Sequence, residues 1–155
     1  TGLGTFRGTG RRFELKGTVH GVRVIDDYGH HPTEIHVTLE AARRFADAGR
    51  LIVIFQPHRY SRTKAFAAQF ASELNLADRA ILLEVYAASE KPIDGVSSRL
   101  ITSMMTKGEY IPNFVEVTDS VVADAQPGDV IMTLGAGDVS SLAPIIVEGL
   151  SRRFE

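Results

Sequence analysis

The sequence contains no cysteine. This absence excludes disulfides, thiolate metal sites and cysteine nucleophiles, and it is compatible with a reducing compartment. The longest apolar runs are far shorter than a membrane span, and the N-terminus lacks the charged-then-apolar layout of a signal peptide. The net charge of -2 gives no general attraction to nucleic acid or to an anionic membrane. We therefore expect a cytoplasmic protein with no nucleic-acid or membrane partner.

Two motifs of self-sufficient enzymes are also missing. The sequence has no phosphate-binding loop ending in Gly-Lys-Ser or Gly-Lys-Thr, and no Gly-x-Ser-x-Gly nucleophile turn. Residues 133–144, TLGAGDVSSLAP, hold two glycines, but the third glycine of a dinucleotide-binding fingerprint would fall at Ser140. We interpret this segment as a tight turn in which Asp138 or Ser140 caps the next helix.

Short apolar segments alternate with helical patterns along the chain. Apolar content is 44% and charged content 23%, as in one soluble globular domain. Segments rich in β-branched residues predict strands buried on both faces at 51–55, 80–85, 114–117 and 129–134. Apolar residues at helical spacing predict helices over 32–45, 66–74, 100–105 and 139–150, with Met104 and Met105 packed in the core.

This alternation predicts an α/β fold. We expect a Rossmann-like three-layer sandwich, in which helices cover both faces of a mostly parallel sheet of about six strands. Residues 11–26 predict a hairpin that turns at His20 and Gly21 and adds one antiparallel strand. The glycine-rich residues 1–10 are expected to be a linker or the tail of a preceding domain, and residues 11–155 the domain itself.

Two polar turns follow predicted strands. They are VIDDYGHHPTEI, residues 24–35, and FQPHRYSRTKAF, residues 55–66. Both would lie at the carboxyl ends of their strands, where open α/β sheets bind ligands. Arg59 and Arg62 are three residues apart at the start of a predicted helix, a spacing that puts both guanidinium groups on one face. Together with free backbone N–H groups at the start of this helix, the two arginines predict an anion site. The alternative interpretation is two solvated surface arginines.

The histidines and aspartates of these turns allow a different hypothesis. The residues Asp26, Asp27, His30, His31 and His58 would supply enough ligands for a self-contained metal-dependent hydrolase. Adjacent side chains on an extended turn diverge, however, so one of the two neighbouring histidines should face the cleft and the other should cap or pack. We therefore predict no metal site in this chain. A non-catalytic module that binds an anion or a nucleotide is a third hypothesis.

Three further residues have two interpretations each. Asp27 can simply end a strand or hold ribose hydroxyls, as carboxylates do at this place in α/β folds. Tyr28 is either part of an amphipathic cleft wall or a platform for a ring. Glu90, in the loop of residues 86–95, faces either the cleft or solvent.

Five segments, in this order and spacing, resemble the C-terminal domain of the Mur ligases: RRFE, VIDDYGHHPTEI, FQPHRYSRT, VYAASEKPIDG and GAGDVSSLA. The resemblance covers nearly the whole chain from Arg11 onward, and it is nearest to the members that join L-alanine to UDP-N-acetylmuramate. It implies a three-domain enzyme. An N-terminal domain binds UDP-N-acetylmuramate, a central domain holds Mg2+ and most contacts to ATP, and the C-terminal domain binds the amino acid and closes over ATP.

The resemblance also implies roles for this chain and for single residues. The chain would be inactive alone, because its partners are the missing N-terminal and central domains. Asp27 and Tyr28 match positions that contact the nucleotide. The positions that match the site for the carboxylate of L-alanine and its surroundings are His30, His58, Arg59 and Arg62. In the implied reaction, ATP phosphorylates the carboxylate of UDP-N-acetylmuramate and the amine of L-alanine attacks the acyl phosphate.

Overall fold

One sheet of six strands organises the structure. The computed structural model describes residues 13–155, so the hypothesis about residues 1–10 lies outside the described residues. The strand order is β1-β2-β6-β3-β4-β5. β1 pairs antiparallel with β2, and the other neighbouring pairs are parallel. The strands are β1 (Glu14–Val19), β2 (Val22–Asp27), β3 (Leu51–Phe55), β4 (Arg79–Leu82), β5 (Gly108–Tyr110) and β6 (Val130–Leu134). The predicted fold class is confirmed.

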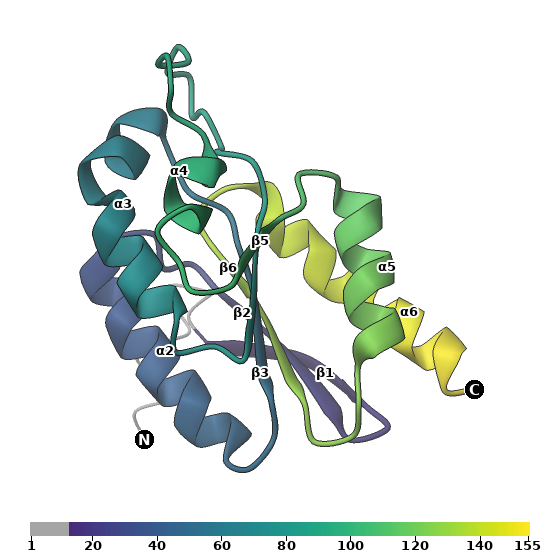
Figure 1. Ribbon diagram of the computed structural model, residues 1–155. Coiled ribbons are helices and arrows are strands. Elements are labelled where there is room, and N and C mark those ends of the chain that lie inside the picture. The colour runs from purple at the N-terminus through teal and green to yellow at the C-terminus, as the bar shows by residue number, and fades with distance from the viewer. Residues whose placement is uncertain (1–12) are drawn as a thin grey trace.

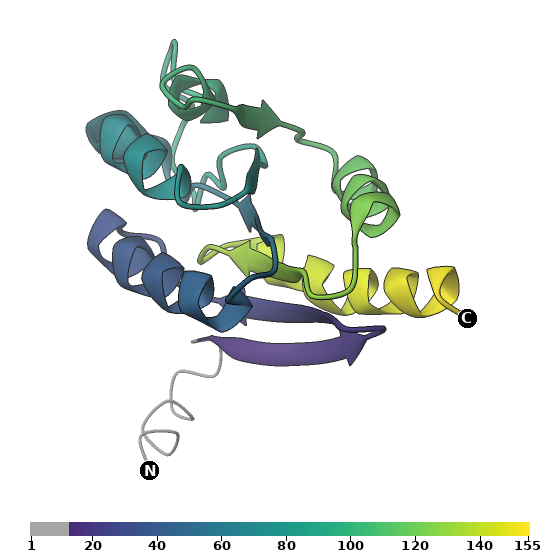
Figure 2. The ribbon, with the colours of Figure 1, turned by 60° about the horizontal axis from the view of Figure 1, so that its bottom comes forward.

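Helices cover both faces of this sheet (Figures 1 and 2). On one face lie α2 (Pro32–Ala46), α3 (Tyr60–Leu74) and the short α4 (Ser98–Thr102). On the other face lie α5 (Phe114–Asp124) and α6 (Leu142–Arg153), which the 3-10 turn η1 (Asp138–Ser141) precedes. Within residues 13–155, no helix is long and apolar enough to cross a membrane.

The central position of β3 in the sheet explains why its sequence is apolar without interruption. Its five residues are all buried. Leu51, Val53 and Phe55 pack into the core beneath α2 and α3, whereas Ile52 and Ile54 pack into the core beneath α5 and α6. Because successive side chains of a strand point to opposite faces, a strand covered on both faces is apolar at every position.

The predicted strand over residues 114–117 is wrong, because these residues begin α5. The Oδ1 of Asn113 accepts a hydrogen bond from the backbone N–H of Glu116 at 3.0 Å and so caps the helix. Val117 and Val121, four residues apart, are the buried positions of the helix. The fifth strand is instead the short β5 at residues 108–110.

Other predicted boundaries also shift. β4 ends at Leu82, and α4 ends at Thr102 rather than at residue 105. The prediction that Met104 packs in the core is wrong, since it is 50% exposed, whereas Met105 packs against the core as predicted. The hairpin turn is confirmed at the predicted place, between β1 and β2.

An ion pair between α2 and α3 makes stability depend on pH. The Nδ1 of His36 lies 2.7 Å from Oε1 of Glu73, and its Nε2 lies 3.5 Å from Glu40. The hydrogen bond and charge of Glu73, and then the charge of Glu40, raise the pKa of His36. Because the folded pKa lies above the unfolded pKa, the stabilisation is fully present below the unfolded pKa. It is lost as the pH rises through the folded pKa.

We expect His36→Gln to lower the Tm of the chain more at about pH 5.5 than at about pH 8. Comparison of the two proteins at each pH isolates His36 from every other titrating group. Thermal denaturation followed by circular dichroism measures the difference. An equal loss of Tm at both pH values would show that the charged form of His36 contributes nothing.

Candidate functional site

The polar turns predicted from the sequence lie at one edge of the sheet. β2, β3 and β6 are mutually parallel, so their carboxyl ends meet there, and β4 adds its own carboxyl end beside β3 (Figure 1). The turns at this edge are residues 28–31, 56–59 and 135–137, together with the loop of residues 83–97. The prediction that the two polar turns share an edge is therefore confirmed.

His30 and His58 bring the two turns into contact, because their ring centroids lie 5.6 Å apart. The Nη1 of Arg62 lies 3.2 Å from Nδ1 of His58 and donates to the His58 carbonyl oxygen at 3.3 Å. Tyr28, which is 42% exposed, meets the His30 ring edge-on at 5.1 Å. We call His30, His58, Arg59 and Arg62 the histidine–arginine cluster.

The imidazole of His58 is neutral at neutral pH. Burial lowers its pKa, and the charges of His30, Arg62 and Arg59 lower the pKa further. Arginine has only donors, so the contact with Arg62 requires a lone pair on Nδ1 and assigns the ring proton to Nε2. The cluster thus presents guanidinium groups beside an uncharged ring.

Arg59 has a strained backbone. It directly precedes α3 with φ 74° and ψ 137°, a conformation that costs a residue other than glycine about 1–3 kcal/mol. Its N–H donates to the carbonyl oxygen of Tyr86 at 2.7 Å, and its own carbonyl accepts from N and Oγ1 of Thr63. Arg59 lies outside the helix, so helical spacing does not align it with Arg62, contrary to the prediction. Its side chain is exposed.

Sequence reasoning missed Tyr86, which packs against the cluster. Its ring stacks on His58 with centroids 5.5 Å apart, and its N–H donates to the carbonyl oxygen of Pro57 at 2.8 Å. His58 and Tyr86 form a parallel bridge that continues the pairing of β3 with β4. An aromatic residue directly beyond the strand of residues 80–85 was the signal in the sequence.

Glu90, which had two interpretations, contacts the start of α3. Its carboxylate accepts hydrogen bonds from the N–H of Ser61 at 3.1 Å and from the Ser61 hydroxyl at 2.5 Å. These bonds lower the pKa of Glu90. The prediction that the backbone N–H groups at the start of this helix are free is therefore wrong for Ser61.

Asp27 holds the end of β2 and the turn that follows. Its carboxylate is buried and accepts from the N–H of Gly29 at 2.8 Å, the N–H of Phe13 at 2.7 Å and the hydroxyl of Thr38 at 3.2 Å. The nucleotide contact implied for Asp27 stays a prediction. These three bonds give the side chain a structural role as well.

We expect Asp27→Ala to lower the free energy of unfolding by about 2 kcal/mol or more, because it leaves buried donors without an acceptor. Chemical denaturation of the 155-residue chain measures this loss. Thr38→Val, which removes one donor and leaves the carboxylate in place, is the matched control with a smaller expected loss. Equal stability of Asp27→Ala and the unchanged chain would contradict the structural role.

His31 lies outside the histidine–arginine cluster and caps α2. Its Nδ1 accepts from the N–H of Thr33 at 3.4 Å, and its ring packs 5.1 Å from that of Phe66, so the predicted divergence from His30 is confirmed.

Asp26 is buried and accepts from the hydroxyl of Thr133 at 2.6 Å. In the part of the chain that the structure describes, no three His, Asp or Glu side chains gather where they could hold a metal ion. The hydrolase hypothesis requires such a group.

The glycine turn after β6 packs closely on Gln56, a residue that sequence reasoning missed. The Nε2 of Gln56 donates to Asp138 at 2.6 Å, and its Oε1 accepts from the N–H of Val139 at 3.1 Å. Neither η1 nor α6 has a side-chain hydrogen bond at its cap residue, so the prediction that Asp138 or Ser140 caps the helix is wrong. A Cβ at Gly137 would lie 2.5 Å from the Gln56 Oε1, so only glycine allows this approach.

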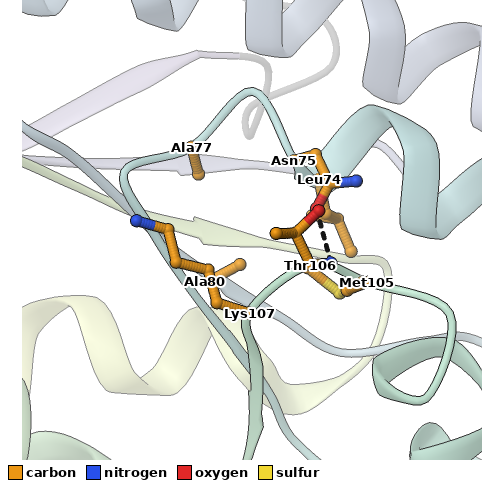
Figure 3. A pocket seen from close by; sticks show the side chains of 7 residues that line it. All are labelled: Leu74, Asn75, Ala77, Ala80, Met105, Thr106 and Lys107. Atoms are coloured by element: carbon orange, nitrogen blue, oxygen red, sulfur yellow. Dashed lines mark hydrogen bonds between the residues drawn. The ribbon is translucent and has the colours of Figure 1, made fainter.

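A pocket of about 180 Å³ lies at the opposite edge of the sheet (Figure 3). It opens between the end of α3 and the turn before β5, where Asn75 Oδ1 accepts from the N–H of Thr106 at 3.4 Å. Leu74 and Met105 supply apolar walls, and Lys107 is the charged residue of its lining. Its position at the amino-terminal ends of the strands separates it from the histidine–arginine cluster.

The fold and these turns define an α/β domain that gathers cationic and aromatic side chains at the carboxyl edge of a parallel sheet. Residues 11–137 match the family model for the Mur ligase, glutamate ligase domain. The chain therefore belongs to this family.

Similar proteins support this assignment. UDP-N-acetylmuramate–L-alanine ligase from Mycobacterium ulcerans (strain Agy99) is 53% identical over 158 residues, which cover 99% of this chain and 32% of the relative. The ligase of the same name from Paenarthrobacter aurescens (strain TC1) is 51% identical over 148 residues, which cover 96% of this chain and 32% of the relative. The chain spans about a third of the length of these curated relatives.

Solved structures of other ligases share the fold. A murein peptide ligase from Psychrobacter arcticus 273-4 superposes with a TM-score of 0.75 at 22% identity, covering 91% of this chain and 30% of that one. The MurF ligase from Thermotoga maritima in complex with ADP superposes with a TM-score of 0.68 at 17% identity, covering 97% of this chain and 37% of that one. At these identities the likeness concerns the fold alone.

Proposed function

We propose that this chain is the C-terminal domain of an ATP-dependent ligase that adds L-alanine to UDP-N-acetylmuramate in peptidoglycan precursor synthesis. The main support is the identity above 50%, over nearly the whole chain, to ligases of that name. In this proposal the domain comprises residues 11–155, and residues 1–10 are the tail of a central domain. The complete enzyme acts in the cytoplasm, and its N-terminal domain binds UDP-N-acetylmuramate.

In the proposed reaction, the carboxylate of UDP-N-acetylmuramate takes the γ-phosphoryl group of ATP and ADP leaves. The neutral amine of L-alanine then attacks the acyl carbon, phosphate departs, and the nitrogen loses a proton to leave an amide. This chain binds and orients L-alanine, because a correctly placed nucleophile removes much of the entropic part of the barrier.

Arg59 and Arg62 bind the carboxylate of L-alanine in this proposal. The methyl group of alanine offers little binding energy, so the carboxylate is the strongest feature to recognise. A guanidinium group binds a carboxylate through two parallel hydrogen bonds and stays protonated at neutral pH. The neutral ring of His58 beside Arg62, and His30 next to it, complete this side of the site.

The nucleotide contacts lie on the other polar turn. The exposed ring of Tyr28 is a stacking surface for the base, and Asp27 lies at the end of β2, where α/β folds hold ribose hydroxyls. ATP reaches these residues when the domain closes. Mg2+ is assigned mainly to the central domain, as the resemblance to the Mur ligases implies.

Product formation by the complete protein tests this function. With the upstream domains present, ATP, Mg2+, L-alanine and UDP-N-acetylmuramate should yield the amide together with ADP and phosphate. The 155-residue chain alone should yield none. Amide formation by the short chain, or its absence from the correctly folded complete protein, would contradict the proposal. A complete protein that binds nucleotide without turnover would favour the non-catalytic module.

A further inference from the structure

Glu90 lies within the electrostatic reach of the histidine–arginine cluster, although it belongs to a different loop. Two hydrogen bonds from Ser61, from its N–H at 3.1 Å and from its hydroxyl at 2.5 Å, hold the carboxylate at the first turn of α3. The charge of Arg59 acts on Glu90, and the charge of Glu90 acts on His58. The carboxylate of Glu90 therefore lies at Ser61, between Arg59 and Arg62 in the sequence at the start of α3.

The backbone of the loop fixes this position. The N–H of Arg59 donates to the carbonyl oxygen of Tyr86 at 2.7 Å, which joins the loop to the turn before α3. Ala88 and Ser89 both have positive φ, 50° and 73°, so the chain turns back directly before Glu90. The loop projects from the edge of the sheet at which α3 begins (Figure 1). Local strain is thus tolerated to bring this carboxylate to the cluster.

We propose that Glu90 binds the ammonium group of the amino-acid substrate and makes the site selective for a zwitterion with a single carboxylate. This inference rests on the proposed function. L-alanine carries both charges on one carbon, so a site that recognises it places an anion next to its cations. Arg59 and Arg62 bind the carboxylate and Glu90 binds the ammonium group. The charge of Glu90 also repels a second carboxylate on a competing molecule.

Glu90 recognises charge and does not take the proton. The bonds from Ser61 hold the pKa of Glu90 below its usual range, so the carboxylate is a poor acceptor at neutral pH. Glu90 binds the ammonium form of the amino acid before reaction. The ammonium group then gives one proton to solvent water, and the neutral amine attacks the acyl carbon. A merely structural contact between the loop and α3 would instead affect all ligands of the site alike.

L-Alanine and propionate, which differ only by the amino group, separate these two roles in the complete ligase. The measured quantities are the KM for L-alanine and the inhibition constant of propionate as a competitor of L-alanine. In Glu90→Gln we expect the KM for L-alanine to rise about tenfold. The inhibition constant of propionate should stay constant or fall, because the lost charge attracted ammonium and repelled carboxylate.

Two control variants sharpen the comparison. Asp94→Asn removes a negative charge from an exposed position of the same loop, and both constants should keep their values. Ser61→Ala removes the hydroxyl bond but keeps the charge of Glu90, so the ratio of the two constants should stay near that of the unchanged enzyme.

The outcomes distinguish this inference from the function on which it rests. If Glu90→Gln changes both constants by the same factor, Glu90 only anchors the loop and its proposed role is overturned. If the unchanged complete enzyme does not join L-alanine at all, the proposed function fails and the role of Glu90 fails with it.

Discussion

In the complete ligase, Arg62→Lys is expected to lower kcat/KM for L-alanine by about tenfold to a hundredfold, with a smaller change for ATP. A charge-assisted hydrogen bond contributes about 1.5–3 kcal/mol, and lysine keeps the charge while it loses the planar fork. In the structure, Nη1 of Arg62 contacts the ring and the carbonyl oxygen of His58. A single ammonium group cannot keep these contacts and also bind both oxygens of a carboxylate.

Arg152→Lys, on the exposed surface of α6, is the matched control for this substitution, because it makes the same chemical change away from the cluster. Steady-state kinetics with varied L-alanine and varied ATP should show no effect of the control. Arg62→Lys should lower the Tm of the isolated chain only slightly, since the contacts that it loses, to the ring and the carbonyl oxygen of His58, are only partly buried. If Arg62→Lys unfolds the chain while the complete enzyme keeps its alanine kinetics, the arginine is structural.

Gly49→Ala is expected to destabilise the chain by about 3–5 kcal/mol, the largest effect on stability that we predict. Gly49 follows α2, and a Cβ there would lie 1.9 Å from the carbonyl oxygen of Gly128 and 3.1 Å from that of Ala46. Both obstacles are backbone, so no side-chain rotation relieves the overlap. Gly128 is itself held by a hydrogen bond from its N–H to the carbonyl oxygen of Gly21 at 2.9 Å.

Gly95→Ala separates this overlap from the ordinary cost of replacing glycine. Gly95 has φ 78°, and a Cβ there would meet no other atom within 4 Å, so alanine should cost about 1–2 kcal/mol through backbone strain alone. Chemical denaturation of both variants measures the difference. Equal losses at the two positions would show that the turns near Gly49 move apart at little cost.

Buried strands were the most predictable part of the fold. β3 and β6 are covered on both faces, and this burial leaves runs in the sequence that are apolar throughout in β3 and apolar except for Thr133 in β6. The start of α5 was not predicted, because Phe114, Val115 and Val117 alternate with Glu116 in part as a strand would. The decisive signal was Asn113 three residues before Glu116, a pattern typical of a helix N-terminus.

The part of the candidate site that lies within single turns was predictable from the sequence. The sequence placed His30, His58 and Arg62 at one edge, and the structure brings these three together. The contacts of Glu90 and Gln56 were not predictable, because each joins segments distant in the chain. Such contacts depend on how the loops pack, which no local pattern of residues encodes.

We propose that the carboxyl edge of this sheet receives L-alanine on one side and the nucleotide on the other. A crystal structure of the complete ligase with L-alanine and a non-hydrolysable ATP analogue tests it most directly. We predict the carboxylate of L-alanine at the guanidinium groups of Arg59 and Arg62, its nitrogen beside Glu90, and the nucleotide against Tyr28. Alanine bound elsewhere, with both guanidinium groups still in solvent, would contradict this proposal.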